Sequence, residues 1–156
     1  MWEGRVLSLH SCAAKSEPLT SPDKLVCLAG IGIEGDRYAL GTGSYSDKPE
    51  TGRQITLIET EALEALARDW NMELKPEETR RNVVTEGAPL NHLVGRQFQI
   101  GGEVVLEGMR LNAPCQYLED LVGIKSLFKA LINRSGLNCR IVTGGTIRGG
   151  DPIRPV

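Results

Sequence analysis

Apolar and polar residues alternate over several short segments of the chain, a pattern typical of β-strands with one buried face. Glycine, proline and small polar residues separate these segments, as expected for the turns of a β-rich protein. Between residues 97 and 109, Gly101 and Gly102 stand between two strand-like runs and predict a β-hairpin. The predicted strands lie within residues 5–10, 25–28, 54–58, 82–85, 97–109 and 138–148.

A period of three to four residues marks the helices. Apolar residues between 63 and 70 recur at the spacing of an amphipathic helix, which Thr60 would cap and whose Trp70 would enter the core. The apolar residues of 118–131 predict one or two further helices. Many short strands with two or three helices favour an α+β, β-rich fold, a barrel with peripheral helices. We find no repeat and no domain boundary, so residues 1–156 are expected to form a single domain.

The overall charge and hydropathy of the chain exclude several classes of partner. The formal net charge is -2 at pH 7, which argues against a broad nucleic-acid-binding surface. No apolar run approaches the ~20 residues that span a bilayer. The first residues do not resemble a secretory signal. We therefore expect a cytoplasmic protein with no nucleic-acid partner and no membrane partner.

The four cysteines, Cys12, Cys27, Cys115 and Cys139, form no C-x-x-C pair and have no zinc-site spacing, so we expect them to be reduced. Cys27 and Cys139 lie in apolar, strand-like segments, where a thiol is usually a small buried hydrophobe. Cys115 differs because it ends the sequence Asn-Ala-Pro-Cys, just after a predicted strand. Pro114 fixes φ and stops the strand, so the Cys115 thiol is expected to enter a loop, as a ligand or a nucleophile would.

Arginine makes up 12 of the 18 basic residues. Its planar guanidinium binds phosphate and carboxylate better than lysine does, although a GC-rich genome alone also produces such a bias. The positions are more informative than the count. Arg37, Arg53, Arg80 and Arg81 lie in or beside predicted loops and strand starts rather than on helix faces. We expect Arg37 and Arg80 to bind the anionic end of a ligand.

Residues 30–35 read Gly-Ile-Gly-Ile-Glu-Gly, a literal match to the dinucleotide-binding motif G-x-G-x-x-G. That motif requires a long helix to follow, whose N-terminus meets the pyrophosphate, and residues 36–43 cannot sustain one. We expect these glycines to form a turn that presents Asp36 and Arg37. The glycine-rich segment 41–52 is expected to be a mobile lid over the site, with an ordinary surface loop as the alternative interpretation.

Six short motifs, in the same order along the chain, resemble those of one known family. The family is the MOSC domain, named for the C-terminal domain of molybdenum cofactor sulfurase, and the resemblance extends from about residue 4 to residue 156. It implies a MOSC-type β-barrel and a role in molybdenum cofactor or sulfur chemistry. The motifs are G-x-x-G-D-R at 32–37, R-x-N-V-V at 80–84, L-x-G-x-x-F-x-I-G at 93–101, Pro-Cys at 114–115, and the closing strands at 136–141 and 145–153.

The resemblance also implies roles for individual residues. In relatives that bind the cofactor, the cysteine that matches Cys115 is a thiolate ligand of molybdenum, a role that soft thiolates suit. Basic, hydroxyl and amide side chains of those relatives hold the phosphate of the cofactor. Asp36 could equally cap a turn. By position, the cofactor-binding residues in this chain are expected to be Lys15, Ser16, Asp36, Arg37, Arg80 and Asn82.

Three functions remain open at this point. The first is a small oxidoreductase that binds the molybdenum cofactor, with Cys115 as metal ligand. The second is a sulfur carrier that holds a persulfide on Cys115. The third is a non-catalytic interaction module with an inert thiol. The ligand partner would be the pterin cofactor or a persulfide donor, and the protein partner a redox protein or a desulfurase. Pyridoxal phosphate is not expected here, because the chain contains no desulfurase domain that would bind it.

Overall fold

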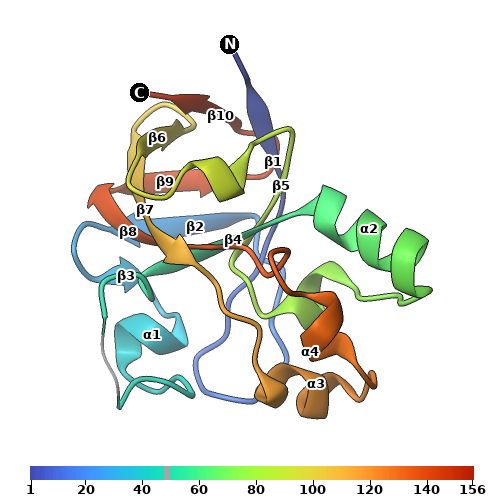
Figure 1. The fold of residues 1–156 in the computed structure, drawn as a ribbon. Coiled ribbons are helices and arrows are strands. Elements are labelled where there is room, and N and C mark those ends of the chain that lie inside the picture. Colours follow the sequence, from blue (N-terminus) through green and yellow to red (C-terminus); the bar gives the residue numbers. More distant parts are fainter. Residues whose placement is uncertain (48–49) are drawn as a thin grey trace.

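Seven strands close into a β-barrel in the computed structural model, which describes residues 1–47 and 50–156 (Figure 1). The order around the barrel is β1-β10-β6-β7-β8-β4-β5, and the neighbouring pairs are antiparallel except β4 and β5, which run parallel. The barrel strands are β1 (Gly4–Leu9), β4 (Ile55–Glu59), β5 (Val83–Glu86), β6 (Gln97–Ile100), β7 (Val104–Leu111), β8 (Leu137–Thr143) and β10 (Pro152–Pro155).

A smaller sheet and several short helices surround the barrel. The three strands of the sheet pair in the order β3-β2-β9. Figure 1 shows both chain termini at one end of the barrel and helices α1 and α3 at the other end. The remaining elements are β2 (Lys24–Leu28), β3 (Gly32–Ile33), β9 (Gly145–Arg148), α1 (Arg37–Leu40), α2 (Thr60–Trp70), α3 (Gln116–Val122), α4 (Leu127–Ala130) and the 3-10 helices η1 (Pro76–Thr79) and η2 (Leu90–His92).

The β-rich α+β barrel expected from the sequence is confirmed, but the described residues form four helices instead of two or three. The additional helix is α1, a single turn that Asp36 caps by accepting a hydrogen bond from the backbone N–H of Tyr38. A helix does follow the G-x-G-x-x-G sequence, but its four residues are too short for the dinucleotide-binding arrangement.

Helix α2 also differs from its prediction at both ends. Thr60 is its first helical residue, and the capping position is Glu59, whose side chain makes no capping hydrogen bond. Trp70 was expected in the core, yet it is 44% exposed. The buried residues of α2 are Ala62, Ala65 and Leu66, in its first half, and Figure 1 shows the helix projecting away from the barrel beyond them. Periodicity identified the helix but not how far the barrel surface extends beneath it.

The main core fills the barrel because the strands alternate between interior and exterior residues. In β1, for example, Val6 and Leu9 are buried, whereas Arg5 and Leu7 are exposed. A second apolar cluster lies under α2, α3 and α4 and includes Leu66, Leu118, Leu127 and Leu131. This cluster holds the two helices that follow Cys115 against α2, and Cys115 itself packs against it, so the position of the thiol depends on it.

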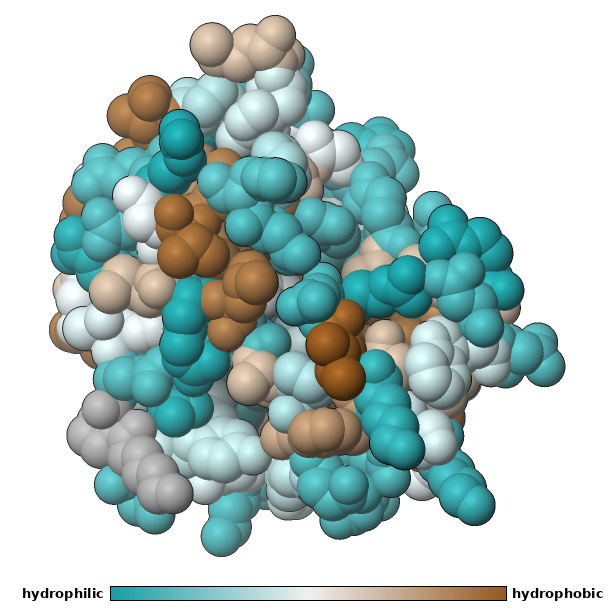
Figure 2. Space-filling model, in the orientation of Figure 1, coloured by the Kyte–Doolittle hydropathy of each residue, from teal (hydrophilic) through white to brown (hydrophobic). Residues whose placement is uncertain are grey.

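The surface is predominantly hydrophilic on the face shown in Figure 2, where apolar residues form only small groups. Among the described residues, no helix combines the length and the apolar character that crossing a membrane requires. The termini and the outer barrel strands carry exposed ion pairs, such as Arg5 with Glu86 and Arg154 with Glu3. Such pairs contribute little to stability, so the fold rests on its apolar core.

Two glycines allow the backbone to approach closely where the barrel closes. At Gly108 in β7, a Cβ atom would lie 2.2 Å from the carbonyl oxygen of Leu93. At Gly136, just before β8, a Cβ atom would lie 2.1 Å from the carbonyl oxygen of Leu57, and φ is +101°. In both places the obstacle is backbone rather than a flexible side chain, so the neighbouring segment would have to move.

We predict that Gly108→Ala destabilises the barrel by about 3 kcal/mol, at the upper end of the usual cost of overpacking, because Leu93 cannot yield without breaking its own backbone contacts. Gly149→Ala is the matched control, since no atom lies within 4 Å of a Cβ there, and it should change stability by less than about 0.5 kcal/mol. Urea unfolding of both variants tests this, and equal midpoints would contradict it.

Candidate functional site

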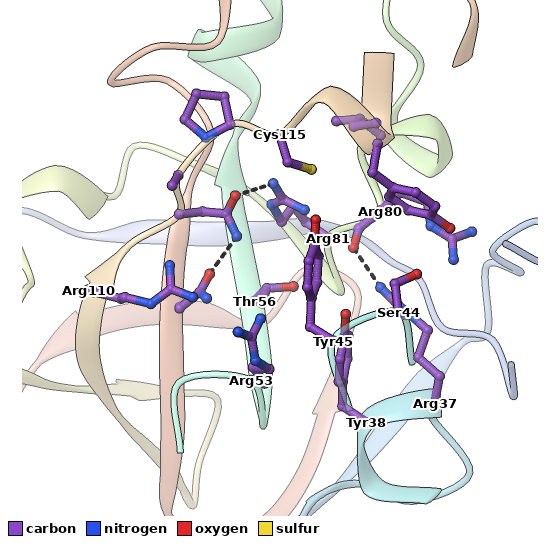
Figure 3. A pocket seen from close by; sticks show the side chains of 16 residues that line it. Arg37, Tyr38, Ser44, Tyr45, Arg53, Thr56, Arg80, Arg81, Arg110 and Cys115 are labelled. Carbon is purple, nitrogen blue, oxygen red and sulfur yellow. Dashed lines mark hydrogen bonds between the residues drawn. The ribbon is translucent and has the colours of Figure 1, made fainter. Parts of the chain in front are cut away.

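A cavity of about 250 Å³ opens at the end of the barrel that carries α1 and α3 (Figure 3). Four chain segments and one residue of β8 form it, and they come together only because the barrel closes. Its lining residues are Arg37, Tyr38, Ser44 and Tyr45 from α1 and the loop after it, Arg53 and Thr56 at the start of β4, Arg80 and Arg81 before β5, Arg110, Asn112, Ala113, Pro114, Cys115, Tyr117 and Leu118 from the end of β7 into α3, and Asn138 of β8.

The cavity is strongly positive. Five arginines line it, and none of the described lining residues is acidic. Two carboxylates lie behind them: Asp36 contacts Arg37 at 3.1 Å, and Glu50 contacts Arg110 at 2.7 Å. Positive charge therefore exceeds negative charge around the opening, and the field favours an anion.

Cys115 is half-buried and lies immediately before α3, with an extended backbone conformation. A hydrogen bond with the Cys115 sulfur, together with burial, raises the pKa of the Tyr45 hydroxyl to about 12. The Tyr45 O–H group is thus held as a donor to the sulfur. Cys115 was expected just past a strand end with its thiol in a loop, and in the structure it lies between β7 and α3 with its thiol in the cavity.

The other three cysteines are buried and free. Burial raises the pKa of Cys27 to about 12 and that of Cys139 well above its usual range. Such thiols stay protonated and unreactive, as expected for small hydrophobes of the core. Cys12 contacts the site indirectly, because its sulfur lies 3.8 Å from a guanidinium nitrogen of Arg80. Among the four, Cys115 alone lines the cavity.

Arg37 and Arg80 form one side of the cavity, and the Arg37 side chain is bonded to the backbone of Arg80. Arg37 donates from one nitrogen to the carboxylate of Asp36 at 3.1 Å and from another to the backbone carbonyl of Arg80 at 3.0 Å. Arg80 donates to the backbone carbonyl of Glu17. Its own backbone is left-handed, with φ of +64° at the end of η1. A non-glycine residue seldom adopts this conformation, and such strain gathers at functional sites.

Arg81 lies at the floor of the cavity. Its guanidinium donates to the backbone carbonyl of Ser135 at 2.9 Å, to the Ser135 hydroxyl at 3.0 Å and to the side-chain oxygen of Asn112 at 2.5 Å. Burial lowers the pKa of Arg81 to about 10, and the nearby charge of Cys115 partly opposes that effect. Arg81 remains protonated at pH 7, so a fixed positive charge faces the thiol.

Tyr117 stands at the mouth between Arg37 and Arg80 and the loops that cover them. Burial raises its pKa, but hydrogen bonds with Ser16 and Ser44 and the charges of Arg80 and Arg37 lower it by more, so the net shift is downward. The Ser16 and Tyr117 hydroxyl oxygens are 2.7 Å apart. Tyr117 therefore connects the loop after β1, the loop after α1 and helix α3 around the opening.

Four of the predicted cofactor-binding residues do not line the cavity. Asp36 is buried behind Arg37 and caps α1. The Asn82 side chain accepts from the backbone N–H and the hydroxyl of Thr56 and donates to the backbone carbonyl of His10, so it ties β1, β4 and β5 together beneath the site. Lys15 and Ser16 are exposed, and only Ser16 reaches a lining residue, Tyr117.

For several lining residues, nothing in the surrounding sequence indicated a place in a binding site. Arg110 occupies an alternating position near the end of a predicted strand, where a solvated residue is expected. Tyr117 has the spacing of an ordinary helix residue. Asn112 is the exception, because it belongs to the same Asn-Ala-Pro-Cys sequence as Cys115. Tyr38 and Tyr45 also line the cavity.

The segment expected to be a lid, residues 41–52, contributes directly to the site. Ser44 and Tyr45 line the cavity, and the Glu50 carboxylate contacts Arg110 and Arg53. Residues 48 and 49 lie outside the described residues. Opening and closing of this segment stays a prediction.

Comparisons with known proteins support the fold. The YuaD protein from Bacillus subtilis superposes with a TM-score of 0.83 at 21% identity, covering 98% of this chain and 97% of that one. YiiM from Geobacillus stearothermophilus gives 0.73 at 14% identity over 98% and 75% of the two chains, and YiiM from Escherichia coli gives 0.69 at 19% over 97% and 69%. The comparison with curated proteins produced no match. The family model described as "MOSC domain" matches residues 36–154, and the chain therefore belongs to the MOSC domain family.

Proposed function

We propose that this chain binds the molybdenum cofactor in the arginine-lined cavity and acts as a small molybdenum-dependent oxidoreductase, with Cys115 as the thiolate ligand of the metal. MOSC domains are associated with this cofactor, and that association supplies its identity. The observation that carries the proposal is a single half-buried thiol that faces five arginines in one cavity. A soft metal ligand and an anion-binding surface are the two features that such a cofactor requires.

The donor set fits a metal carried by an organic cofactor rather than a bare ion. The described residues contain no group of three or more histidines, cysteines or acidic residues that could hold a metal ion. A metal that arrives already bound to its cofactor needs few ligands from the protein, and Cys115 offers one. When bound, the cofactor supplies the electron transfer to or from the substrate, and the protein supplies binding and orientation.

Arg37 and Arg80 are suited to the phosphate of the cofactor. Guanidinium groups form paired, charge-assisted hydrogen bonds with phosphate oxygens. The hydroxyls of Ser44 and Tyr117 line the cavity beside these arginines and can donate to the same group. Exposed Lys15, next to Ser16 at the mouth, adds positive charge on the approach.

Asp36 and Asn82 act on the cofactor through other residues in this proposal. Asp36 fixes Arg37 by an ion pair at 3.1 Å, and Asn82 fixes the backbone beside Arg81 by its contacts with Thr56. Near the metal end, the O–H of Tyr45 orients the Cys115 sulfur, and the positive charge of Arg81 lies close to it. A volume of about 250 Å³ encloses only part of a pterin cofactor, so the remainder would face solvent.

We predict that Cys115→Ser keeps the fold but lowers the molybdenum bound per chain at least about tenfold, because a serine hydroxyl is a hard and weak ligand for this metal. Cys139→Ser is the matched control. It puts a hydroxyl into the core and should lose about 1–3 kcal/mol of stability, while it keeps the metal. Elemental analysis and urea unfolding measure the two effects. Unchanged molybdenum in Cys115→Ser would rule out the proposed ligand.

The same preparations separate the oxidoreductase from the two other candidate functions. The protein is purified from cells with an intact cofactor pool, and molybdenum and sulfane sulfur are both measured per chain. We expect molybdenum that is lost in Cys115→Ser. Labile sulfur without molybdenum, dependent on Cys115, would identify a sulfur carrier, and neither element would identify an interaction module.

We predict that Arg80→Ala weakens inorganic phosphate binding to the cofactor-free protein about tenfold or more, as expected when a charged hydrogen-bonding partner is lost. Arg80→Lys should bind with intermediate affinity because lysine lacks the paired donors. Both variants keep a Cβ in the left-handed conformation, so the backbone strain is equal. The control is Arg140→Ala, which removes an arginine paired with Glu107 away from the cavity. Equal phosphate affinity in Arg80→Ala and Arg140→Ala would remove Arg80 from the site.

A further inference from the structure

Four of the five arginines of the cavity fall into two groups, and the fifth is the buried Arg81. Figure 3 shows Arg37 and Arg80 on one side of the Tyr45 ring and Arg53 and Arg110 on the other. Contacts within each group support this division. Arg37 donates to the backbone carbonyl of Arg80 at 3.0 Å, whereas Arg53 and Arg110 share one carboxylate. The phosphate end of the proposed cofactor accounts for the first group only.

The second group already binds a carboxylate, and the protein itself supplies it. Oxygen atoms of Glu50 lie 2.7 Å from Arg110 and 3.5 Å from Arg53. The two guanidinium groups therefore stand at the separation that one carboxylate bridges. They also carry one more positive charge than Glu50 neutralises, so this side of the cavity still attracts an anion.

The Glu50 contact is easily exchanged for a ligand. The side chains of Glu50 and Arg110 are 39% and 38% exposed, and ion pairs this accessible to solvent are weak. Arg53 is more firmly held, because it is 17% exposed and its guanidinium lies 5.0 Å from the centre of the Tyr45 ring. An anion that enters the cavity can displace the carboxylate of Glu50 while Arg53 keeps its orientation.

This side of the cavity is also the one with a route to the thiol. Tyr45 contacts Arg53 through its ring and the Cys115 sulfur through its hydroxyl. Beside Arg110, the amides of Asn112 and Asn138 hydrogen-bond to each other at 2.8 Å and line the cavity. A small molecule bound by Arg53 and Arg110 thus contacts polar side chains, and only the Tyr45 side chain separates it from Cys115.

We propose that Arg53 and Arg110 form a second anion subsite, which binds the carboxylate, or an equivalent planar oxyanion, of a small substrate, and that Glu50 occupies this subsite in the free protein. The substrate class rests on the proposed function, because that function requires the substrate to bind next to the metal ligand Cys115. Glu50 acts as an internal competitor that the substrate replaces.

The test uses cofactor-free protein and two separate probes, benzoate for the second subsite and inorganic phosphate for the first. Binding is followed by NMR, with the side-chain N–H signals of the arginines as the local readout. Because a competing carboxylate is removed, Glu50→Gln should bind benzoate about threefold or more tightly than the natural chain. Arg110→Ala should bind it about fivefold or more weakly, and Arg110→Lys should lie between.

Two control variants define the outcome. Glu107→Gln removes a carboxylate that pairs with Arg140 away from the cavity and should leave benzoate binding unchanged. Arg80→Ala should weaken phosphate binding but leave benzoate binding within about twofold. The second subsite is overturned if the affinity for benzoate is the same in the Glu50 and Arg110 variants as in the natural chain. It is also overturned if the binding of benzoate and of phosphate depends on Arg80 alone. Those results would not contradict the cofactor proposal. Phosphate binding that is unchanged in Arg80→Ala would contradict the cofactor proposal but not the second subsite.

Discussion

The structure of the site depends on how its crowded arginines are held. Like charges in one small cavity repel, so each guanidinium needs partners that fix it. Most of those partners are neutral: backbone carbonyls accept from Arg37, Arg80, Arg81 and Arg110. A carbonyl holds a guanidinium without cancelling its charge, whereas a carboxylate would cancel it. The cavity therefore combines order with a surplus of positive charge, which is the condition for binding an anion with preorganised donors.

The barrel supplies those carbonyls from segments that are distant in sequence. Arg81 is held by Ser135, and Arg80 by Glu17, so the loops before β5, before β8 and after β1 must meet at one end of the barrel. Asn82 sets that meeting point, because its amide bonds to Thr56 and to the backbone of His10. The parallel pairing of β4 with β5 begins at the next residues, where Leu57 pairs with Val83. A single amide thus couples the closure of the barrel to the geometry of the site.

Local sequence predicted those parts of the fold and site that local chemistry determines. Alternation located most of the strands but not β10, and Pro114 identified Cys115 as a presented thiol because proline interrupts a strand locally. Arg37 and Arg80 were found from motifs that place them beside turns. Asn82 was also found, but as a binding residue, whereas its side chain bonds to backbone groups on either side of β5.

The parts that the sequence did not predict depend on contacts between distant residues. Arg110 faces the cavity because β7 bends there, where its pairing with β8 shifts register between Gly108 and Arg110. Trp70 is exposed because α2 is longer than the surface it covers. The interaction of Glu50 with both Arg53 and Arg110 joins residues from a loop and a distant strand, and no periodicity reports such a contact.

The central claim is that a thiolate of this chain meets the metal of a cofactor whose anionic end lies among its arginines. X-ray absorption at the molybdenum edge tests it most directly, on cofactor-loaded protein and on Cys115→Ser loaded to the same metal content in vitro. The account predicts one sulfur neighbour fewer around molybdenum in the variant. Identical sulfur coordination in the two proteins would contradict it, because Cys115 would then have no bond to the metal.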